Sequence, residues 1–360
     1  MRKYRVVDLF SGCGGISKGF FDTNRVDIVG AIDFDQAACE TFQKNFPNAS
    51  VFCGDINDIS VKDTGFKNID ILVGGPPCQG FSRLNYWDKD RDNDPRNKLF
   101  LQYLRFVEEL QPKAILIENV KQILTSKNGY VPQHITNFLT ELGYTVKYEI
   151  LCASDFGVPQ SRYRAFFVAL RKEYGEFNFD FLNKYHCEMT TVYDAISDIE
   201  AIEETAKTLE QGTVYTIGEP LSEYQKTMQS DDKQLHNHLI YYPAANVQHM
   251  MTFVPQGGNW RCVPENLFKS KRDNRYTNYL RRLRHDAPSV TIDTGHNVYF
   301  HPTFNRVPTI RESARIQSFP DSFIFLGNKG QQFRQVGNAV PPLLAKALAF
   351  AIMEVLDEKE

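Results

Sequence analysis

Short, almost continuously apolar segments alternate with helical patterns through the first half of this 360-residue sequence. The segments that we expect to form strands are Tyr4 to Phe10, Val26 to Ile32, Ile69 to Gly74, Ala114 to Ile117 and Arg164 to Leu170. Helical spacing of apolar residues lies between them, at Asp35 to Asn45, Lys98 to Leu110 and Val131 to Leu142. Strands that are apolar on both faces are typical of a parallel sheet covered by helices. The sequence therefore predicts an α/β fold with a doubly wound parallel sheet.

The regular pattern ends at about Leu170. Turns and polar segments follow up to about Phe304, and two further helical segments lie at Ile310 to Gln317 and Leu343 to Leu356. We expect a smaller domain of mixed, mostly irregular structure inserted into the sheet domain, because a chain of this length suits more than one domain. The predicted parts are residues 1–185, the inserted residues 186–328, and a C-terminal return of residues 329–360 into the first domain.

The formal net charge of -3 gives no sign of a polyanionic partner. That sum conceals two unlike stretches. Residues 188–232 contain eleven Asp or Glu and two Lys, whereas residues 261–284 contain eight Lys or Arg and two acids. The acidic stretch fits a solvated face, and the basic cluster is the part that we expect to contact phosphate.

Cysteine usage and the lack of long apolar runs indicate where the protein works. The 7 cysteines form no Cys-x-x-Cys pair, which fits neither a disulfide framework nor a zinc site. No apolar run approaches the ~18 residues of a membrane span, and Asp8 interrupts the N-terminal region too early for a signal peptide. We expect a cytoplasmic protein with reduced thiols and no metal site.

The first predicted strand leads into a glycine-rich turn, Asp8-Leu9-Phe10-Ser11-Gly12-Cys13-Gly14-Gly15. Glycines at such a turn let a ligand approach the backbone. Asp33 ends the second strand, at the sequence separation from the glycine-rich turn where an acid commonly binds ribose hydroxyls. Phe34 beside it can stack on an adenine. The turn predicts a nucleoside-containing cofactor of open identity, and the alternative is an ordinary tight turn with an incidental acid.

Two further groups are predicted at the carboxyl ends of strands, where doubly wound folds bind their ligands, and two arginines follow later in the chain. Cys78 lies in the string GGPPCQGFS, whose prolines and glycines suit a positioned nucleophile, although a buried small cysteine is the alternative. Glu118 ends the next strand and could give a proton to a substrate under attack. Arg162 and Arg164 are at strand spacing, which predicts two cations on one face.

Together these motifs resemble those of the DNA (cytosine-5) methyltransferases of prokaryotic restriction–modification systems. The shared strings, in that family's order, are DLFSGCGG, AIDFD, GDI, GGPPCQGFS, ILIENV, QSRYRAFFVAL, RRLRHDAPSVTI, TIRESARIQSFPDSF and QVGNAVPP. About residues 190–280 match no motif and correspond to the family's target-recognition region. The resemblance implies a Rossmann-like methyltransferase sheet, S-adenosylmethionine as cofactor, and a flipped-out cytosine in a specific sequence of double-stranded DNA as substrate.

The resemblance also implies roles for individual residues. Cys78 would add to carbon 6 of the cytosine, Glu118 would hydrogen-bond or protonate ring nitrogen 3, and Arg162 and Arg164 would hold the base and order the acid. The residues implied to bind the cofactor are Phe10, Gly12, Cys13, Gly14, Gly15, Asp33, Phe34, Asp55, Ile56, Pro77, Leu99, Asn338 and Val340. The residues expected to contact DNA are Gln79, Gly80, Ser82, Arg261, Arg275, Arg281, Arg282 and Arg284.

The size of the chain favours a stand-alone, monomeric enzyme that protects DNA from a partner restriction endonuclease. One branch of the family keeps the same motifs but methylates tRNA, so a tRNA cytosine-5 methyltransferase is the alternative. The long region without motifs, with Gly257-Gly258-Asn259-Trp260, favours DNA. A catalytically inactive DNA- or cofactor-binding module is a more remote alternative, because Cys78, Glu118 and both arginines are present. An oxidoreductase would explain the glycine-rich turn but neither the Cys78 motif nor the two arginines.

Overall fold

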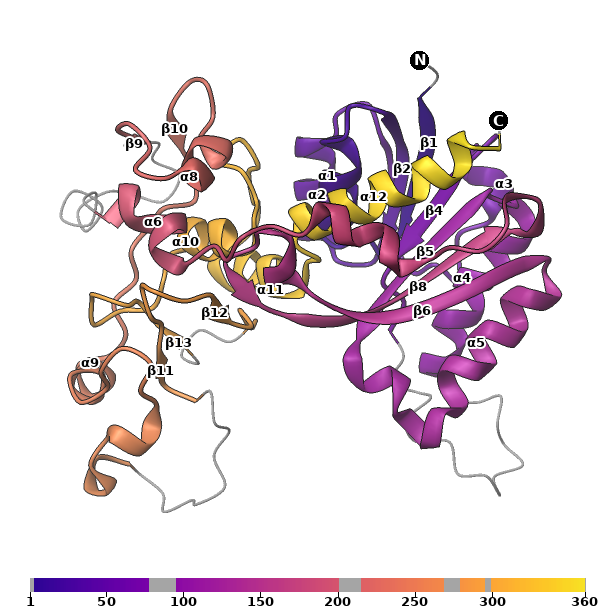
Figure 1. Ribbon diagram of the computed structural model, residues 1–360. Coiled ribbons are helices and arrows are strands. Elements are labelled where there is room, and N and C mark those ends of the chain that lie inside the picture. Colours follow the sequence, from indigo (N-terminus) through magenta and orange to yellow (C-terminus); the bar gives the residue numbers. More distant parts are fainter. Residues whose placement is uncertain (1–2, 78–94, 201–214, 269–278, 295–298, 360) are drawn as a thin grey trace. The chain divides into compact units, whose positions relative to one another are not determined.

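The computed structural model describes residues 3–77, 95–200, 215–268, 279–294 and 299–359. The chain divides into two compact units, coloured along the sequence in Figure 1. The sheet unit consists of Met1–Cys152, Tyr163–His186 and Pro342–Glu360, and the inserted unit consists of Ala153–Arg162 and Cys187–Pro341. The sequence placed the insertion at residues 186–328. The structure adds two pieces to the inserted unit, residues 153–162 and residues 329–341.

The sheet unit is built on a seven-stranded sheet with the order β3-β2-β1-β4-β5-β8-β6. Its strands are β1 Tyr4–Leu9, β2 Val26–Asp33, β3 Ser50–Cys53, β4 Ile71–Gly74, β5 Ala114–Val120, β6 Tyr144–Cys152 and β8 Tyr163–Arg171. Strands β1 to β5 are parallel, and β8 is antiparallel to both β5 and β6. The predicted doubly wound α/β fold is therefore confirmed.

Two details of the predicted sheet are wrong. The strand expected at Arg164 to Leu170 runs antiparallel, because an apolar run reveals burial on both faces but not strand direction. Strand β6 was not predicted; it lies at the edge of the sheet, and its middle residues, 147–150, are all exposed. An exposed edge strand has no continuous apolar run for the sequence to reveal.

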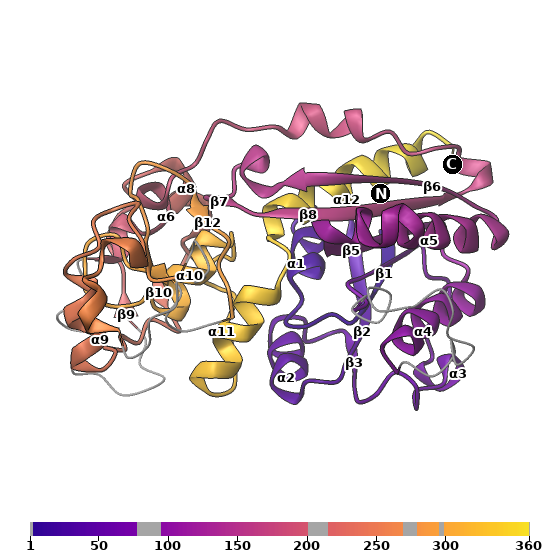
Figure 2. The ribbon, with the colours of Figure 1, turned by 90° about the horizontal axis from the view of Figure 1, so that it is seen from below.

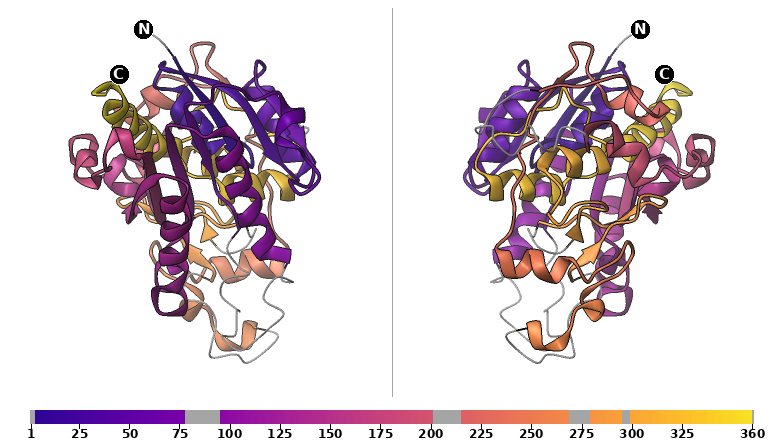
Figure 3. Two further views of the ribbon diagram at one scale, coloured as in Figure 1. Left: turned by 90° about the vertical axis from the view of Figure 1, so that its right-hand side faces the viewer. Right: turned by 90° about the vertical axis from the view of Figure 1, so that its left-hand side faces the viewer.

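Helices cover both faces of this sheet. They are α1 Gly15–Phe21, α2 Gln36–Asn45, α3 Val61–Thr64, α4 Pro95–Leu110, α5 Tyr130–Glu141 and α12 Pro342–Asp357. The main core lies between the sheet and helices α4 and α5, which face the viewer in Figure 3, left; it contains Val7 and Leu9 of β1, Tyr103 of α4 and Ile135 of α5. Short 3-10 turns, η2 Lys121–Leu124, η3 Ser126–Gly129, η5 Lys172–Tyr174 and η6 Phe179–Tyr185, connect these elements.

The C-terminal helix α12 packs closely against α1 in the sheet unit. A Cβ atom added at Gly19 of α1 would lie 2.4 Å from the carbonyl oxygen of Pro342, so only glycine permits this approach. The stretch Lys329–Asp357 is long and apolar enough to cross a membrane by length and composition, but 72% of its apolar window is buried inside the protein. Helix α12 is therefore a core element of the sheet unit.

The inserted unit is mixed and largely irregular, as predicted. Its helices are α6 Val192–Glu200, α8 Glu223–Met228, α9 Ala245–Met251, α10 Ile310–Ile316 and α11 Lys329–Asn338. Its strands are β7 Gln160–Ser161, β9 Tyr215–Thr216, β10 Gln234–Leu235, β11 Arg281–Arg282, β12 Ser289–Val290 and β13 Tyr299–Phe300, joined as the pairs β9–β10, β11–β13 and β7–β12. Three 3-10 turns belong to the same unit: η4 Ala153–Phe156, η7 Trp260–Cys262 and η8 Glu265–Leu267.

Buried charges hold much of the inserted unit together. Arg306 and Glu312 form a two-point ion pair with N···O distances of 2.7 and 2.8 Å, and both side chains are fully buried. Arg315 is likewise buried between Asp198 and Asp321. The Arg306 guanidinium and His301 contribute to holding the pKa of Glu312 well below its usual range despite its burial. Removing one partner of such a pair would leave the other charge buried and uncompensated.

Candidate active site

The acid at the end of β2 holds the glycine-rich turn in place. The Asp33 carboxylate accepts hydrogen bonds from the backbone N–H groups of Gly12, at 2.7 Å, and Asp35, at 2.9 Å. Burial raises the pKa of Asp33, while these two backbone donors oppose that rise. A Cβ atom added at Gly12 would meet no atom of the described residues within 4 Å, so these residues leave open space above the turn. The turn therefore presents its backbone to that space beside a fixed carboxylate.

The other residues of the turn are shaped by packing. Gly14 has φ +93°, and a Cβ there would lie 2.8 Å from the ring of Phe42. Phe10 also has a positive φ, 57°. Cys13 is 1% exposed, and burial raises the pKa of its thiol. Its side chain is therefore part of the core. Helix α1 begins at Gly15.

The residues expected around an adenine lie at the ends of β2 and β3. Phe34 is 79% exposed, an unusual exposure for a phenylalanine in this position and one that leaves its ring free for stacking. Asp55 is exposed and accepts hydrogen bonds from the backbone and side chain of Asn57. Ile56 is 3% exposed, so its side chain belongs to the core and only its backbone is left for a ligand. The fit to a nucleoside therefore rests on an open glycine turn, an acid and an exposed ring.

The remaining predicted cofactor residues are divided between the two units. Leu99 of α4 packs against the main core and is partly exposed, and Pro77 is also partly exposed. Asn338 is exposed and Val340 is buried, both within the inserted unit. Their contribution to a cofactor site stays a prediction.

The predicted acid and one predicted arginine form an ion pair. Antiparallel pairing sets Val120 of β5 opposite Arg164 of β8, which brings Glu118 within reach of Arg164. The Arg164 Nε atom lies 3.0 Å from Glu118 Oε1, and the two side chains are only 18% and 13% exposed. Arg164 also donates to the carbonyl oxygen of Tyr163, at 2.9 Å. The guanidinium therefore fixes the position of the carboxylate at the end of β5.

The same end of β5 holds the segment that leads to Cys78. A Cβ atom at Gly75 would lie 3.2 Å from Glu118 Oε2, so the carboxylate lies against this glycine. Asn119 Nδ2 donates to the carbonyl oxygen of Pro76, at 2.8 Å. Cys78 itself, with Gln79, Gly80 and Ser82, lies outside the described residues. Asn119 lies in the string ILIENV, but the sequence alone does not reveal this anchoring role.

Arg162 does not lie on the strand that carries Arg164, because β8 begins at Tyr163. Arg162 lies between β7, which pairs with β12 of the inserted unit, and β8, which belongs to the sheet. It is 1% exposed, and its guanidinium donates to the carbonyl oxygens of Ile292 and Asn338, each at 3.3 Å. A two-residue spacing places two side chains on one face only within a continuous strand, and here the chain passes from the inserted unit to the sheet unit between the two arginines.

Arg282 does not lie on the surface, and the expectation that it contacts DNA phosphate is wrong. The residue is 6% exposed, and burial lowers the pKa of its guanidinium. An arginine has five N–H donors, and all five of Arg282 are used inside the inserted unit at 2.6 to 3.0 Å. The acceptors are the carbonyl oxygens of Met251, Val254, His301 and Phe304 and the side chain of Asn305.

The other basic residues expected to contact DNA differ in their surroundings. Arg261 is exposed and lies over the ring of Trp260, at 4.9 Å from its centroid. Arg281 is partly exposed. Arg284 is exposed but binds both carboxylate oxygens of Asp286, at 2.8 and 2.7 Å. Arg275 lies outside the described residues.

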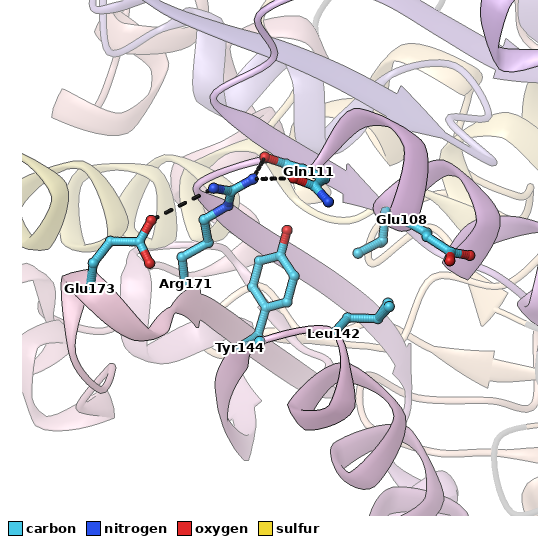
Figure 4. A pocket seen from close by; sticks show the side chains of 8 residues that line it. Glu108, Gln111, Leu142, Tyr144, Arg171 and Glu173 are labelled. Atoms are coloured by element: carbon cyan, nitrogen blue, oxygen red, sulfur yellow. Dashed lines mark hydrogen bonds and ion pairs between the residues drawn. The ribbon is translucent and has the colours of Figure 1, made fainter.

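A cavity of about 210 Å³ in the sheet unit, drawn in Figure 4, is separate from these residues. Its lining includes Gln111, Tyr144 and Arg171, and Arg171 is bound to Gln111 and Glu173. These residues lie near the start of β5 and β6 and the end of β8, so the cavity is at the opposite end of these strands from Glu118. None of the predicted site residues lines this cavity.

A seven-stranded sheet of this order, with an open glycine turn and an acid at the carboxyl ends of β1 and β2, defines a Rossmann-like methyltransferase. The chain belongs to the C-5 cytosine-specific DNA methylases, whose family model matches residues 4–354. It is a DNA (cytosine-5-)-methyltransferase that uses S-adenosylmethionine as methyl donor and DNA as substrate.

Similar proteins extend over almost the whole chain. The Type II methyltransferase M1.HphI of Haemophilus parahaemolyticus is 36% identical over 353 residues, which cover 97% of this chain and 86% of that protein. The Type II methyltransferase M.DdeI of Desulfomicrobium norvegicum is 36% identical over 372 residues, 96% of this chain and 87% of its own length. A solved E. coli structure, described as a DNA modification methyltransferase encoded within a prophage, has a TM-score of 0.79 and 26% identity, covering 99% of this chain and 100% of its own.

Proposed function

We propose that this methyltransferase acts through a covalent bond between Cys78 and carbon 6 of a flipped-out cytosine. The observation that supports the proposal is the Arg164–Glu118 pair, which lies against Gly75, three residues before Cys78 in the sequence. The Asn119 side chain fixes the backbone between Gly75 and Cys78 through its hydrogen bond to the Pro76 carbonyl oxygen. An acid held in this way suits proton donation to a ring that a neighbouring thiolate attacks.

In the proposed reaction, the Cys78 thiolate adds to carbon 6 and the electron pair of the carbon 5–carbon 6 double bond becomes available at carbon 5. Glu118 hydrogen-bonds or protonates ring nitrogen 3, which relieves the negative charge of the ring. When bound, S-adenosylmethionine supplies the methyl group. Loss of the carbon 5 proton then restores the double bond and expels Cys78. Arg164 orients Glu118 and offers its remaining donors to the base.

The proposed cofactor contacts use the open space at the ends of β1, β2 and β3. Asp33 would bind the ribose hydroxyls, Phe34 would stack on the adenine, and the backbone around Gly12 would face the methionine end. The support is the fixed Asp33 carboxylate, the exposed Phe34 ring and the absence of any atom within 4 Å of a Cβ at Gly12 in the described residues.

We also propose a cognate restriction endonuclease that cuts the same DNA sequence, a monomeric state and a cytoplasmic location. The relatives' description as Type II methyltransferases supports the first of these. Arg261 and Arg281 are proposed to contact DNA phosphates, because each is at least partly exposed. Arg284 is exposed too and is proposed to contact phosphate once it is released from Asp286.

Trapping on a duplex with 5-fluorocytosine tests the proposal, because fluorine cannot leave as the carbon 5 proton does and the covalent bond to the enzyme persists. The wild-type chain should form an adduct that survives denaturing electrophoresis, and Cys78→Ser should form none. Glu118→Gln should slow trapping by about 100-fold, the usual contribution of a general acid. An adduct in Cys78→Ser would overturn the proposed nucleophile, and trapping or methylation of tRNA alone would favour the RNA alternative.

A further inference from the structure

A buried glutamine at the end of α10 joins two of the sequence motifs that carry predicted site residues. Gln317 follows the last residue of α10 and is fully buried in the inserted unit. It lies in the string TIRESARIQSFPDSF, whose residues have no role in the proposed reaction. Helices α10 and α11 pack together in this unit, and Figure 2 shows the paired strands β7 and β12 beside them.

The Gln317 amide uses both of its donors and its acceptor. Its Nε2 group donates to the carbonyl oxygens of Val336, at 3.0 Å, and Ala339, at 2.7 Å. Its Oε1 atom accepts a hydrogen bond from the Nε2 group of Gln160. Because carbonyl oxygens can only accept, the amide cannot turn over without losing these bonds. Gln317 therefore holds the end of α11 on one side and β7 on the other.

Each of the two held segments carries a residue with a predicted role. The segment at the end of α11 contains Asn338, whose backbone carbonyl oxygen accepts a hydrogen bond from Arg162 at 3.3 Å. The β7 segment contains Gln160, two residues before Arg162. Gln160 Oε1 accepts the backbone N–H of Ile292 at 2.9 Å, and Arg162 donates to the carbonyl oxygen of the same residue at 3.3 Å. The side chains of Gln160 and Arg162 are thus fixed on a common set of partners.

This fixed segment ends where β8 begins. Two residues after Arg162, Arg164 forms its ion pair with Glu118 in the sheet unit. One extended residue spans at most about 3.6 Å, so a displacement of Arg162 would reach Arg164 across a single intervening residue. An error of about 1 Å in the position of a catalytic group can lower a reaction rate about 100-fold.

We infer that Gln317 is a positioning residue for methyl transfer, because it holds the Arg162 segment and the Asn338 segment in a fixed relation. The inference rests on the proposed role of Arg164 in orienting Glu118. Without the Gln317 amide, the carbonyl oxygens at the end of α11 and the side chain of β7 lose a buried partner and must rearrange. The chemical step should slow while DNA binding persists, because a fully buried side chain cannot contact DNA.

The test compares single turnovers of the full-length enzyme and its Gln317→Met variant. Excess enzyme and saturating labelled S-adenosylmethionine are mixed with PCR-amplified genomic DNA, which carries no methyl groups, and methyl incorporation is followed over time. Methionine has a similar length but no amide, so the variant should be slowed about 10- to 100-fold. Affinity for the same DNA, measured by filter binding, should stay close to that of the wild type.

Gln225 offers a matched control in the same unit. It is also fully buried, and its Nε2 group donates to the Ser197 hydroxyl, at 2.8 Å, and the Tyr193 carbonyl oxygen, at 3.4 Å. Its Oε1 atom accepts the backbone N–H of Leu221 at 2.6 Å. Gln225→Met should lower the melting temperature much as Gln317→Met does, but it should leave the turnover rate unchanged. Equal slowing in both variants, or a wild-type rate in Gln317→Met, would overturn the inference.

Gln160→Met removes the other side of the same link and keeps the inference testable if Gln317→Met does not fold. Its turnover should also be slow, and a wild-type rate would overturn the inference. The double variant should be slowed by less than the product of the two single effects, because both changes break one shared bond; a full product would show that the two side chains act independently and would contradict the link.

Arg164→Ala separates this inference from the proposed function. The variant should be slow in the same single-turnover measurement, because it leaves Glu118 without its guanidinium partner. Normal methyl transfer in Arg164→Ala would contradict the proposed role of the Arg164–Glu118 pair even if Gln317→Met is slow. Slow methyl transfer in Arg164→Ala together with a wild-type rate in Gln317→Met would overturn the role of Gln317 alone.

Discussion

Asp8 is a buried carboxyl group beneath the glycine turn. It is 1% exposed, and its Oδ2 atom accepts a hydrogen bond from Ser17 at 2.7 Å. Its Oδ1 atom has no hydrogen-bond partner among the described residues. Burial raises the pKa of Asp8 to about 7, and the charge of Asp33 contributes in the same direction. The motif string contains Asp8, but sequence alone does not show that its carboxyl group is buried.

Replacing Asp8 with asparagine should change how stability depends on pH. The folded wild type holds a proton on Asp8 up to about pH 7, whereas the unfolded chain releases it near pH 3.8. Asp8 therefore lowers the free energy of unfolding as pH rises from about 4 through 7. Asp8→Asn should gain stability relative to the wild type over this range, by up to ~4 kcal/mol.

Urea unfolding of the cofactor-free proteins at pH 5, 6, 7 and 8 would measure this difference. Asp27→Asn is the matched control, because Asp27 is exposed and forms an ion pair with Lys3 at the surface. Its difference from the wild type should not grow with pH in the same way. A constant difference between Asp8→Asn and the wild type would show that the carboxyl group stays ionised over this range.

Among the elements, the short strand β11 shows how a charge pattern can mislead. Arg281 and Arg282 are adjacent in a basic cluster, yet only Arg282 is buried. Its guanidinium donates hydrogen bonds from β11 to the end of α9, to the turn that follows α9 and to the segment that follows β13. The sequence predicted most strands of the seven-stranded sheet and the helices α2, α4, α5, α10 and α12, because burial leaves an apolar pattern. It could not predict β6, the direction of β8 or the fate of Arg282, because these depend on neighbours distant in the chain.

Arg282→Ala should destabilise the inserted unit by about 3 kcal/mol or more, since it leaves several buried carbonyl oxygens without donors. Thermal unfolding would measure the loss. Arg284→Ala is the control, because that side chain is exposed and should change stability by no more than about 0.5 kcal/mol. Equal stability of both variants would show that the hydrogen bonds of Arg282 contribute little.

For the whole molecule, the net charge of -3 is a sum over unlike parts. The structure reduces the expected basic surface further, because Arg282 is internal and Arg284 is neutralised by Asp286. Of the predicted site, the acid, one arginine and the glycine turn could be located from the sequence, since each lies at a strand end. The ion pair between Arg284 and Asp286 could not be predicted from the sequence, because Asp286 is recognisable as a partner only once the turn is folded.

Asp286→Asn should free Arg284 for phosphate. DNA affinity should increase, and the logarithmic salt dependence of binding should steepen by about 0.9, the contribution of one further phosphate contact. Fluorescence anisotropy from about 50 to 200 mM salt would measure both. Asp231→Asn makes the same charge change in the exposed acidic stretch and should leave the salt dependence unaltered. An unchanged slope in Asp286→Asn would mean that Arg284 gains no phosphate contact when it is released from Asp286.

The division of the chain has a consequence for how new specificities can arise. The chain crosses between the sheet unit and the inserted unit at Cys152, Arg162, His186 and Pro341, so the inserted unit consists of two separate pieces of sequence. The carbonyl groups that hold Arg162 come from the second piece, at Ile292 and Asn338. A recombination event that replaced only the long piece would supply those carbonyls from a foreign parent. If the inserted unit recognises the target sequence, as the region without motifs predicts, successful exchanges of DNA specificity should preserve the backbone around Ile292 and Asn338 while varying other residues from Cys187 onward.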